Sequence, residues 1–302
     1  MATQEQANRT LAAHVDTLIA HPNVTSVSVI EDEDGENIIE IGLVGPENGP
    51  QAANAGPLPD ELPVPDDTGR PVPGAPAIPV RKRIVGEVRG ISFTDRVRPA
   101  HGGDSCGPAV TKSAGTLGAR VDRKGTPCIL SAWHVLYRDP ATDGTRIVQP
   151  GSLDGGTEPK DAIGTNLRGI LSDTLDAAIA TIDKPAGDFV ETGTRCYGAI
   201  SGVDKAKVTM AVKKCGRSTQ STSGTVTSVN STVKVTHPSY PGGEKVFSNQ
   251  IQMTLKAIAG DSGAVVLTHK DAAVGLLFAA SATDGWANHI QDVMDAFGVT
   301  FA

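Results

Sequence analysis

The sequence Gly260-Asp261-Ser262-Gly263 is followed directly by the apolar run Ala264-Val265-Val266-Leu267, and this pairing of a tight turn with a strand decides the interpretation of the chain. Glycine on both sides of a serine lets the backbone turn sharply, because glycine adopts dihedral angles that other residues avoid. In such a turn the backbone N–H groups of Gly260 and Ser262 can point at one oxyanion. Glycine-rich turns are common, so the strand that follows is what marks Ser262 as a candidate nucleophile.

Two further residues, both upstream of Ser262, also stand at the boundary of an apolar segment. His134 lies at the end of a strongly apolar segment, residues 129–136, which predicts a strand, and Asp176 opens a second apolar segment. The order is therefore His134, Asp176, Ser262. Attack on a peptide carbonyl needs a hydroxyl, a base that takes its proton, and a carboxylate that holds the imidazole tautomer. Each residue also has a plainer interpretation. His134 alone could be a satisfied core histidine, and Asp176 could be a strand-initiating cap, with Asp173 as a competing carboxylate.

This order and these contexts resemble the chymotrypsin-like (trypsin-like) serine proteases. The likeness covers about residues 80–300. Within that family the sequence resembles one subgroup, the cytoplasmic bacterial trypsin-like peptidases and their plant narrow-leaf-type relatives. The segments that carry this resemblance are 129–156, 213–219, 223–226 and 274–281.

The resemblance implies an all-β, two-barrel fold with a C-terminal helix, and a serine endopeptidase that acts on proteins or peptides. Ser262 would be the nucleophile, His134 the general base, and Asp176 the carboxylate that orients the imidazole. The N–H groups of Gly260 and Ser262 would form the oxyanion hole. Two other functions stay open on the same fold: a catalytically silent binding or regulatory module, and a serine esterase.

The same resemblance places the substrate pocket. Counting back six residues from Ser262 puts Lys256 at the pocket floor, and Phe278 and Ala280 belong to the strand that would line the pocket. A cation at the floor repels basic side chains. We therefore expect specificity against Lys and Arg.

Two other motifs have alternative interpretations. Gly103-Asp104-Ser105-Cys106-Gly107 is a second Gly-Asp-Ser, but it precedes His134, and we interpret it as a turn. Arg83-Ile84-Val85-Gly86-Glu87 resembles the site at which trypsin-like zymogens are cut, after which the new ammonium would pair with Asp261. The same residues also fit an ordinary strand, so a constitutively formed site is the default expectation.

The composition agrees with a β-rich fold. Aromatic residues make up 4% of 302 residues, whereas there are 34 glycines and 20 prolines, which favours short strands and turns over long helices. Short alternating segments recur from about residue 78 onward. Asn288 is a candidate N-cap for a last helix whose apolar stripe ends at Phe297.

The N-terminal part has a different pattern. Residues 3–20 predict a helix, and residues 24–30 and 38–44 predict two strands. Ten of the 20 prolines then fall in residues 46–79, a density that no central strand or helix tolerates. We therefore divide the chain into a small α-β-β unit at 1–45, a proline-rich linker at 46–79 and a trypsin-like protease domain at 80–302.

Charge and hydropathy exclude several classes of partner. The net charge is −7 and the longest basic run is Arg81-Lys82-Arg83, so nucleic acid is not expected as a partner. No apolar run approaches the ~20 residues that cross a bilayer, so no membrane is expected either. The polar N-terminal sequence lacks a signal-peptide pattern, which predicts a cytoplasmic, bacterial protein. The oligomeric state cannot be predicted.

The residues that usually bind metals form no recognisable site. Seven histidines never fall at metal-binding spacings, and the glycine motifs that bind phosphates are absent, so no metal and no cofactor are expected. In a reducing compartment the cysteines would be free, buried thiols. They are Cys106, Cys128, Cys196 and Cys215.

Overall fold

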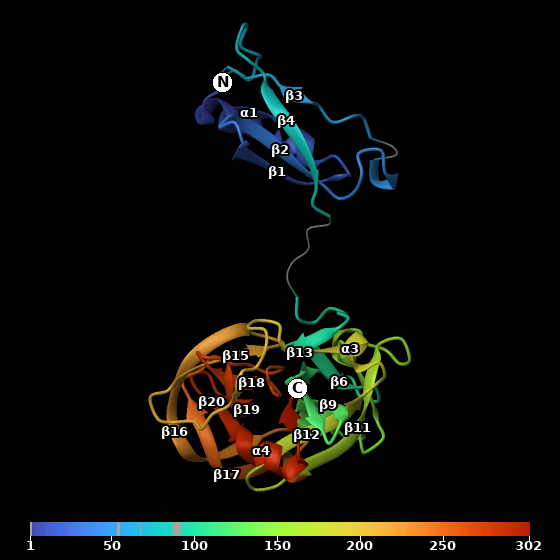
Figure 1. Ribbon diagram of the computed structural model, residues 1–302, viewed down its shortest axis with the longest axis vertical. Helices are drawn as coiled ribbons and strands as arrows, with labels where there is room; N and C mark the ends of the chain where they lie inside the picture. Colours follow the sequence, from blue (N-terminus) through green and yellow to red (C-terminus); the bar gives the residue numbers. More distant parts are fainter. Residues whose placement is uncertain (1, 53–54, 67, 87–91) are drawn as a thin grey trace. The chain divides into compact units, whose positions relative to one another are not determined.

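The computed structural model describes residues 2–52, 55–66, 68–86 and 92–302. They belong to two compact units, Met1–Ile91 and Ser92–Ala302 (Figure 1).

The first unit packs one helix on a four-stranded sheet. Helix α1 (Gln4–Ile19) begins with the predicted capping box, in which the side chains of Thr3 and Gln6 each accept the other's backbone N–H. Its buried Ala7 and Leu18 share a core cluster with the isoleucines of the sheet. The strands pair in the order β1 (Val24–Glu31), β2 (Asn37–Leu43), β4 (Ile78–Ile84), β3 (Glu61–Leu62), and a short 3₁₀ turn, η1 (Pro50–Ala52), lies between β2 and β3 in the chain.

The boundary between the units differs from the predicted one at residue 80. Strand β4 pairs in parallel with β2, so it completes the N-terminal sheet instead of opening a barrel. The proline-rich segment contributes β3 and the buried side chains of Leu58, Leu62 and Val64 to the same unit. Alternation alone could not assign β4, because an alternating strand fits any sheet with one buried face. The sequence pattern predicts one strand over residues 77–91, and residues 87–91 lie outside the described residues.

The second unit consists mainly of two curled sheets, which Figure 1 shows side by side. The eight-stranded sheet has the order β21 (Thr300–Phe301), β8 (Ala119–Arg123), β9 (Thr126–Ser131), β12 (Asp176–Ile182), β11 (Ala162–Leu171), β10 (Arg146–Val148), β6 (Ser105–Pro108), β7 (Gly115–Thr116). The seven-stranded sheet has the order β14 (Gly202–Val203), β19 (Ala272–Ala280), β18 (Val265–Thr268), β15 (Ala211–Gly216), β16 (Gln220–Thr236), β17 (Glu244–Met253), β20 (Gly285–His289). Strand β19 also pairs with β20, which closes the second sheet into a barrel. The predicted all-β, two-barrel architecture is confirmed.

Short elements complete the second unit. They are β5 (Ala100–Gly102), which pairs with β13 (Val190–Thr194), the helices α2 (Trp133–Leu136), α3 (Ala186–Phe189) and α4 (Ile290–Phe297), and the 3₁₀ turns η2 (Ser152–Asp154) and η3 (Pro241–Gly243). The predicted C-terminal helix is therefore present as α4. Its N-cap is His289, not the predicted Asn288, because Asn288 is the fourth residue of β20 and its side chain is buried there.

The core of the second unit extends from one sheet to the other. One buried cluster contains Ile129 and Ile147 of the eight-stranded sheet together with Tyr240, Phe247 and Phe278 of the other half. Side chains from both sheets therefore meet where β9 ends. His134 lies three residues beyond β9, in the single turn of α2 and not in the predicted strand.

Candidate active site

His134 and Asp176 form a buried pair at the end of neighbouring strands. Strands β9 and β12 are antiparallel, with Ser131 opposite Ala178, so the start of β12 lies beside the turn that follows β9. Asp176 is fully buried and His134 is 6% exposed. The imidazole Nδ1 lies 2.7 Å from Asp176 Oδ2, and the backbone N–H of His134 donates to Oδ1 at 3.2 Å. The carboxylate thus fixes both the backbone and the ring of His134.

This environment keeps the carboxylate charged. Burial by itself would raise the pKa of Asp176, because a charged group loses its water, but the charge of His134 and hydrogen bonds from His134 and Tyr240 outweigh burial. The pKa of Asp176 therefore lies below its ordinary value of 3.8. An ionised acceptor at Nδ1 favours the tautomer in which Nε2 is free to take a proton.

No sequence pattern pointed to two residues of the loop between β16 and β17. Tyr240 Oη donates a hydrogen bond to Asp176 Oδ2. The ring centroid of His237 lies 4.5 Å from that of His134. Burial lowers the pKa of His237 to about 4, and the charges of His134 and Arg138 add to the effect. His237 is therefore neutral around pH 7.

Ser262 lies in the same cleft as His134. The cleft has a volume of about 460 Å³, and its walls include His134, Ser262, Phe278 and Ala280. Ser262 Oγ donates to the carbonyl oxygen of Phe278 at 3.2 Å. In the described part of the chain no hydrogen bond joins Ser262 Oγ to His134. The structure thus places His134 and Ser262 on the walls of one cleft, with Asp176 buried and hydrogen-bonded to His134.

The turn that carries Ser262 is anchored by the buried side chain of Asp261. Its carboxylate accepts hydrogen bonds from the backbone N–H groups of Ser218 (2.9 Å), Thr219 (3.0 Å) and Ile258 (3.0 Å). Thr116 of the other sheet bonds the same turn, since its N–H donates to the carbonyl of Ser262 at 2.9 Å. Both sheets therefore hold the turn in place.

The backbone around Gly260 and Ser262 leaves the two N–H groups of the predicted oxyanion hole without an acceptor among the described residues. Gly260 has φ +99°, a conformation that L side chains rarely adopt. A Cβ at Gly260 would also lie 2.3 Å from Ser218 Oγ. Neither the N–H of Gly260 nor that of Ser262 donates a hydrogen bond within the described residues. Both groups are thus available to a ligand.

Of the three residues predicted for the substrate pocket, Phe278 and Ala280 line the cleft and Lys256 does not. Lys256 is exposed and does not line the cleft, whereas Ala257 does. Leu255 and Ala257 are buried on either side of it, so the segment alternates, and a count that is off by one residue exchanges the inner and outer faces. The cations of the cleft are Lys112, Arg138 and Arg217.

The second Gly-Asp-Ser turn is structural, as predicted. Ser105 is fully buried and donates to Asp154 Oδ2 at 2.5 Å. Burial raises the pKa of the neighbouring Cys106 thiol to about 12, with a smaller contribution from the charge of Asp104. A thiol in this state is not a nucleophile at neutral pH.

The structure does not support activation by cleavage after Arg83. Ile84 belongs to β4 of the N-terminal sheet, and Asp261, the expected partner of a new ammonium group, already has Lys214 Nζ at 3.5 Å. An internal cation thus occupies the position that the activation hypothesis reserved for a new chain terminus.

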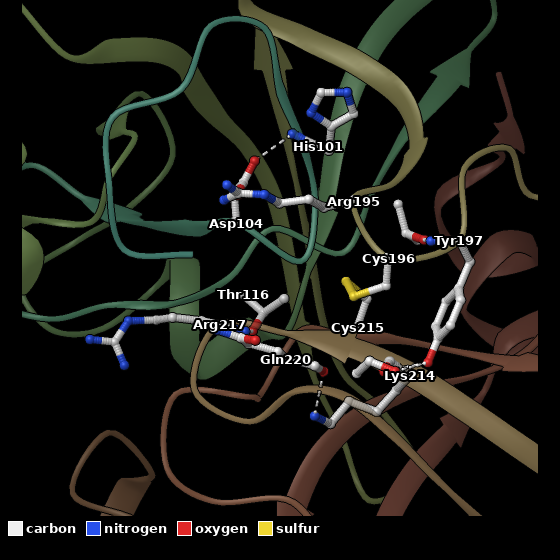
Figure 2. The surroundings of a disulfide bond; sticks show 12 residues. His101, Asp104, Thr116, Arg195, Cys196, Tyr197, Lys214, Cys215, Arg217 and Gln220 are labelled. Carbon is white, nitrogen blue, oxygen red and sulfur yellow. Dashed lines mark hydrogen bonds and ion pairs between the residues drawn. A yellow bond between two sulfur atoms is a disulfide. The ribbon is translucent and has the colours of Figure 1, made fainter. Parts of the chain in front are cut away.

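The expectation of four free cysteines is wrong for two of them. Cys196 and Cys215 form a disulfide across 19 residues, while Cys106 and Cys128 are free and buried. Figure 2 shows the disulfide between the ion pair of Arg195 with Asp104 and the side chain of Lys214. Spacing alone could not reveal this pairing, because four cysteines allow several connectivities.

The described residues contain neither a metal site nor a membrane-spanning helix. No group of His, Cys, Asp and Glu side chains there could hold a metal ion. None of the described helices has the length and apolar character needed to cross a membrane.

Comparisons with known proteins bear on the fold. No protein-family model matches the sequence, and no curated protein matches it. Among solved structures, Thermobifida fusca protease A is 20% identical with a TM-score of 0.52, over 67% of this chain and 97% of its own. A glutamic acid-specific serine protease, described as using a histidine triad in substrate binding, is 24% identical with a TM-score of 0.52, over 67% of this chain and 100% of its own. A Nocardiopsis protease is 17% identical with a TM-score of 0.51, over 66% of this chain and 97% of its own.

The second unit has the trypsin-like serine protease fold. These structures are bacterial serine proteases of that fold family, and the fold expected from the resemblance is confirmed. At identities below 25% the likeness concerns the fold and not the reaction.

Proposed function

We propose that the chain is a serine endopeptidase that cleaves proteins or peptides through Ser262, His134 and Asp176. The observation that carries this proposal is the buried pair of His134 and Asp176, with 2.7 Å between Nδ1 and Oδ2, in which His134 lines the same cleft as Ser262. A pair of this kind is the base that a serine hydroxyl needs. The same cleft is lined by Gly260 and Ser262, whose N–H groups donate to no acceptor among the described residues.

In the proposed reaction Ser262 Oγ attacks the carbonyl carbon of the substrate while His134 Nε2 takes the hydroxyl proton. This requires one rotation of the serine side chain away from the Phe278 carbonyl. The electron pair of the C=O bond moves to its oxygen, and the N–H groups of Gly260 and Ser262 stabilise that charge. His134 then protonates the leaving amine, the C–N bond breaks, and water removes the acyl group from Ser262 by the same steps.

The substrate would bind in extended form along β19, near residues 277–281. Phe278 and Ala280 lie there on the cleft wall. An extended peptide at a strand edge gains main-chain hydrogen bonds, which give affinity without sequence preference, while the cleft selects side chains.

A fluorophosphonate probe tests the nucleophile. We expect covalent labelling of the unmodified chain and hydrolysis of an unfolded protein substrate. Ser262→Ala should abolish both, with a loss of ~10⁴ or more in turnover. Ser105→Ala is the matched control, since it alters the other Gly-Asp-Ser turn and should keep labelling. Labelling that survives in Ser262→Ala refutes the assignment.

The same experiment separates the alternatives. A catalytically silent binding module would not label at all. A serine esterase would label and would hydrolyse small esters, but it would leave the unfolded protein substrate uncut.

The narrower kinship with cytoplasmic bacterial trypsin-like peptidases, and with it a cytoplasmic location, is proposed from the sequence segments alone. The disulfide between Cys196 and Cys215 weakens one argument for that location. Disulfides persist in oxidising compartments and are rare in the cytosol.

A further inference from the structure

Tyr240 reaches the His134–Asp176 pair from the loop that joins β16 to β17. Its Oη donates to Asp176 Oδ2 and lies 3.4 Å from His134 Nδ1. The side chain is 3% exposed. We propose that Tyr240 is a positioning residue, which acts on His134 through Asp176 and sets how tightly the imidazole holds its proton. This inference rests on the proposed function of the cleft.

A fully buried carboxylate needs several donors. It has four lone-pair sites and has lost its water, so each missing hydrogen bond is costly. His134 supplies two donors, its backbone N–H and its ring N–H. Tyr240 supplies the third, and no further side chain donates to Asp176 within the described residues. Tyr240 is therefore the donor that can change without altering His134 itself.

Ring contacts and the hydrogen bonds of its loop hold the side chain of Tyr240 in place. The ring of Tyr240 meets His134 edge-on, with centroids 5.8 Å apart, and Phe247 in the same manner at 5.6 Å. Its loop is closed by two backbone hydrogen bonds, from Tyr240 N–H to His237 O at 3.0 Å and from Gly243 N–H to Tyr240 O at 2.9 Å. Substitution by Phe keeps these ring contacts and removes the hydroxyl alone.

The hydroxyl and the imidazole share one oxygen, Asp176 Oδ2. The bond from Tyr240 stabilises the carboxylate and so weakens its attraction for the imidazolium. Without that bond, Oδ2 depends on His134 alone, and the protonated ring becomes more favourable. The Tyr240→Phe chain should therefore have a His134 ring that loses its proton at a higher pH. Less of the ring is then the neutral base around pH 7, and its imidazolium is a weaker acid toward the leaving amine.

The shift in the pH at which His134 loses its proton can be measured, because the groups around the ring do not change charge in the same range. Asp176, Tyr240 and His237 contact the ring, and Arg138 lines the same cleft. Burial raises the pKa of Tyr240, whereas the charge and hydrogen bonds of His134 and the hydrogen bond from Tyr240 outweigh burial and lower that of Asp176, so neither group changes charge around neutral pH. The pKa of His237 is about 4, and Arg138 stays charged. These neighbours therefore keep their charges between pH 5 and 9.

The test is an NMR titration of the His134 ring in the full chain with Ser262→Ala, which prevents self-digestion. Adding Tyr240→Phe should raise the midpoint by about 0.5 pH unit or more. In the chain with Ser262 intact, Tyr240→Phe should lower kcat about tenfold with little change in KM. An unchanged midpoint overturns the proposal.

Tyr137→Phe is the matched control. Tyr137 is a buried tyrosine whose Oη also donates to an aspartate, Asp143, at 2.5 Å. Its loss should leave the midpoint and kcat unchanged, and an equal shift in both variants overturns the proposal. If Tyr240→Phe fails to fold, 3-fluorotyrosine at the three tyrosines is the second measurement. As a stronger acid it should lower the midpoint, and no shift overturns the proposal.

The two proposals fail separately. A chain that no fluorophosphonate labels contradicts the proposed function, yet the midpoint in Tyr240→Phe still decides the role of Tyr240. A chain that labels normally and whose midpoint ignores Tyr240→Phe retains the proposed function and refutes the positioning role.

Discussion

Lys214 Nζ lies 3.5 Å from Asp261 Oδ2, and both side chains are buried. Lys214 is the fourth residue of β15, and its ammonium also donates to the carbonyl oxygen of Gln220 at 3.1 Å. Asp261 directly precedes Ser262, so this buried ion pair helps to fix the turn that carries the nucleophile. A buried carboxylate without a cation would be unstable, and the chain supplies that cation from its own interior.

Lys214→Met should therefore destabilise the second unit and disturb the turn. Removing one partner of a buried ion pair typically costs about 3–5 kcal/mol, because the other charge is left unpaired. We expect a loss of that size in urea unfolding, together with weaker fluorophosphonate labelling. Lys213→Met is the neighbouring control. Lys213 pairs with the less buried Asp271, so its loss should cost about 1 kcal/mol or less. Equal effects of the two substitutions would contradict this role of Lys214.

The uncut chain should also be fully active. Because Lys214 already neutralises Asp261, no new ammonium group is needed. Arg83→Gln, which removes the candidate cleavage site, should label with fluorophosphonate at the same rate as the unmodified chain. Intact-mass measurement on the active sample checks that nothing has been cut. Activity that appears only in a chain starting at Ile84 would rule this out.

Local patterns in the sequence were enough to select the candidate residues. His134, Asp176 and Ser262 each stand at the end of a segment with a clear apolar pattern, and strands of the same sheet bring the first two together. The fold class followed from the same segments. Where the prediction depended on counting within a loop it failed, as for Lys256, because a shift of one residue exchanges the two faces of a strand.

The remaining parts of the site depend on tertiary structure. Tyr240 contacts Asp176 across 64 residues of sequence, and the Lys214 side chain of β15 lies 3.5 Å from Asp261, which is far from it in the sequence. Tyr240 lies outside every segment that carries the family resemblance, and Lys214 lies in one of them, residues 213–219, without a role that the resemblance assigns to it. The parallel pairing of β4 with β2 joins segments that a proline-rich stretch separates, and alternation within β4 cannot reveal which sheet it joins.

The second unit should become less stable as the pH is lowered, because His237 then takes up a proton. Burial lowers the folded-state pKa to about 4, below the unfolded value of about 6.5. Between these values the unfolded chain binds a proton that the folded chain excludes, so stability is lost as the pH falls from 6.5 to 4. The loss should reach up to about 3 kcal/mol, as measured by urea unfolding at pH 7 and pH 4.5.

His237→Asn should reduce this loss, because Asn does not titrate and can still accept the N–H of Ser239, which now donates to His237 Nδ1 at 3.1 Å. His269→Asn, at an exposed position, is the control. An identical pH dependence in the chain and in His237→Asn would show that the ring titrates in the folded state as it does in water.

The disulfide gives a count that can be checked directly. In denaturant, two thiols should react before reduction, Cys106 and Cys128, and all four after it. Replacing Cys196 and Cys215 together by Ser should cost about 3 kcal/mol, because the unfolded chain regains the freedom of the closed loop. Four reactive thiols before reduction, in protein purified without reductant, would show that the bond does not form.

The charge of the cleft should disfavour basic side chains in the substrate. Its cations include Arg217, which is neutralised by Asp154 at 2.5 Å, and Lys112 and Arg138, which have no ion-pair partner among the described residues. A region with one sign of uncompensated charge favours the opposite sign in its ligand. This replaces Lys256 as the reason for the predicted specificity.

We therefore expect a peptide library to be cleaved with higher kcat/KM where acidic residues flank the scissile bond than where Lys or Arg do. Arg138→Gln should reduce the preference about fivefold at low salt, since one partly exposed ion pair is worth about 1 kcal/mol. The preference should also shrink as added salt screens the cleft. Lys234→Gln is the matched control, because Lys234 is exposed, lies on β16 and does not line the cleft. Preferential cleavage after Arg or Lys, unaffected by Arg138→Gln, would show that another feature of the cleft selects the substrate.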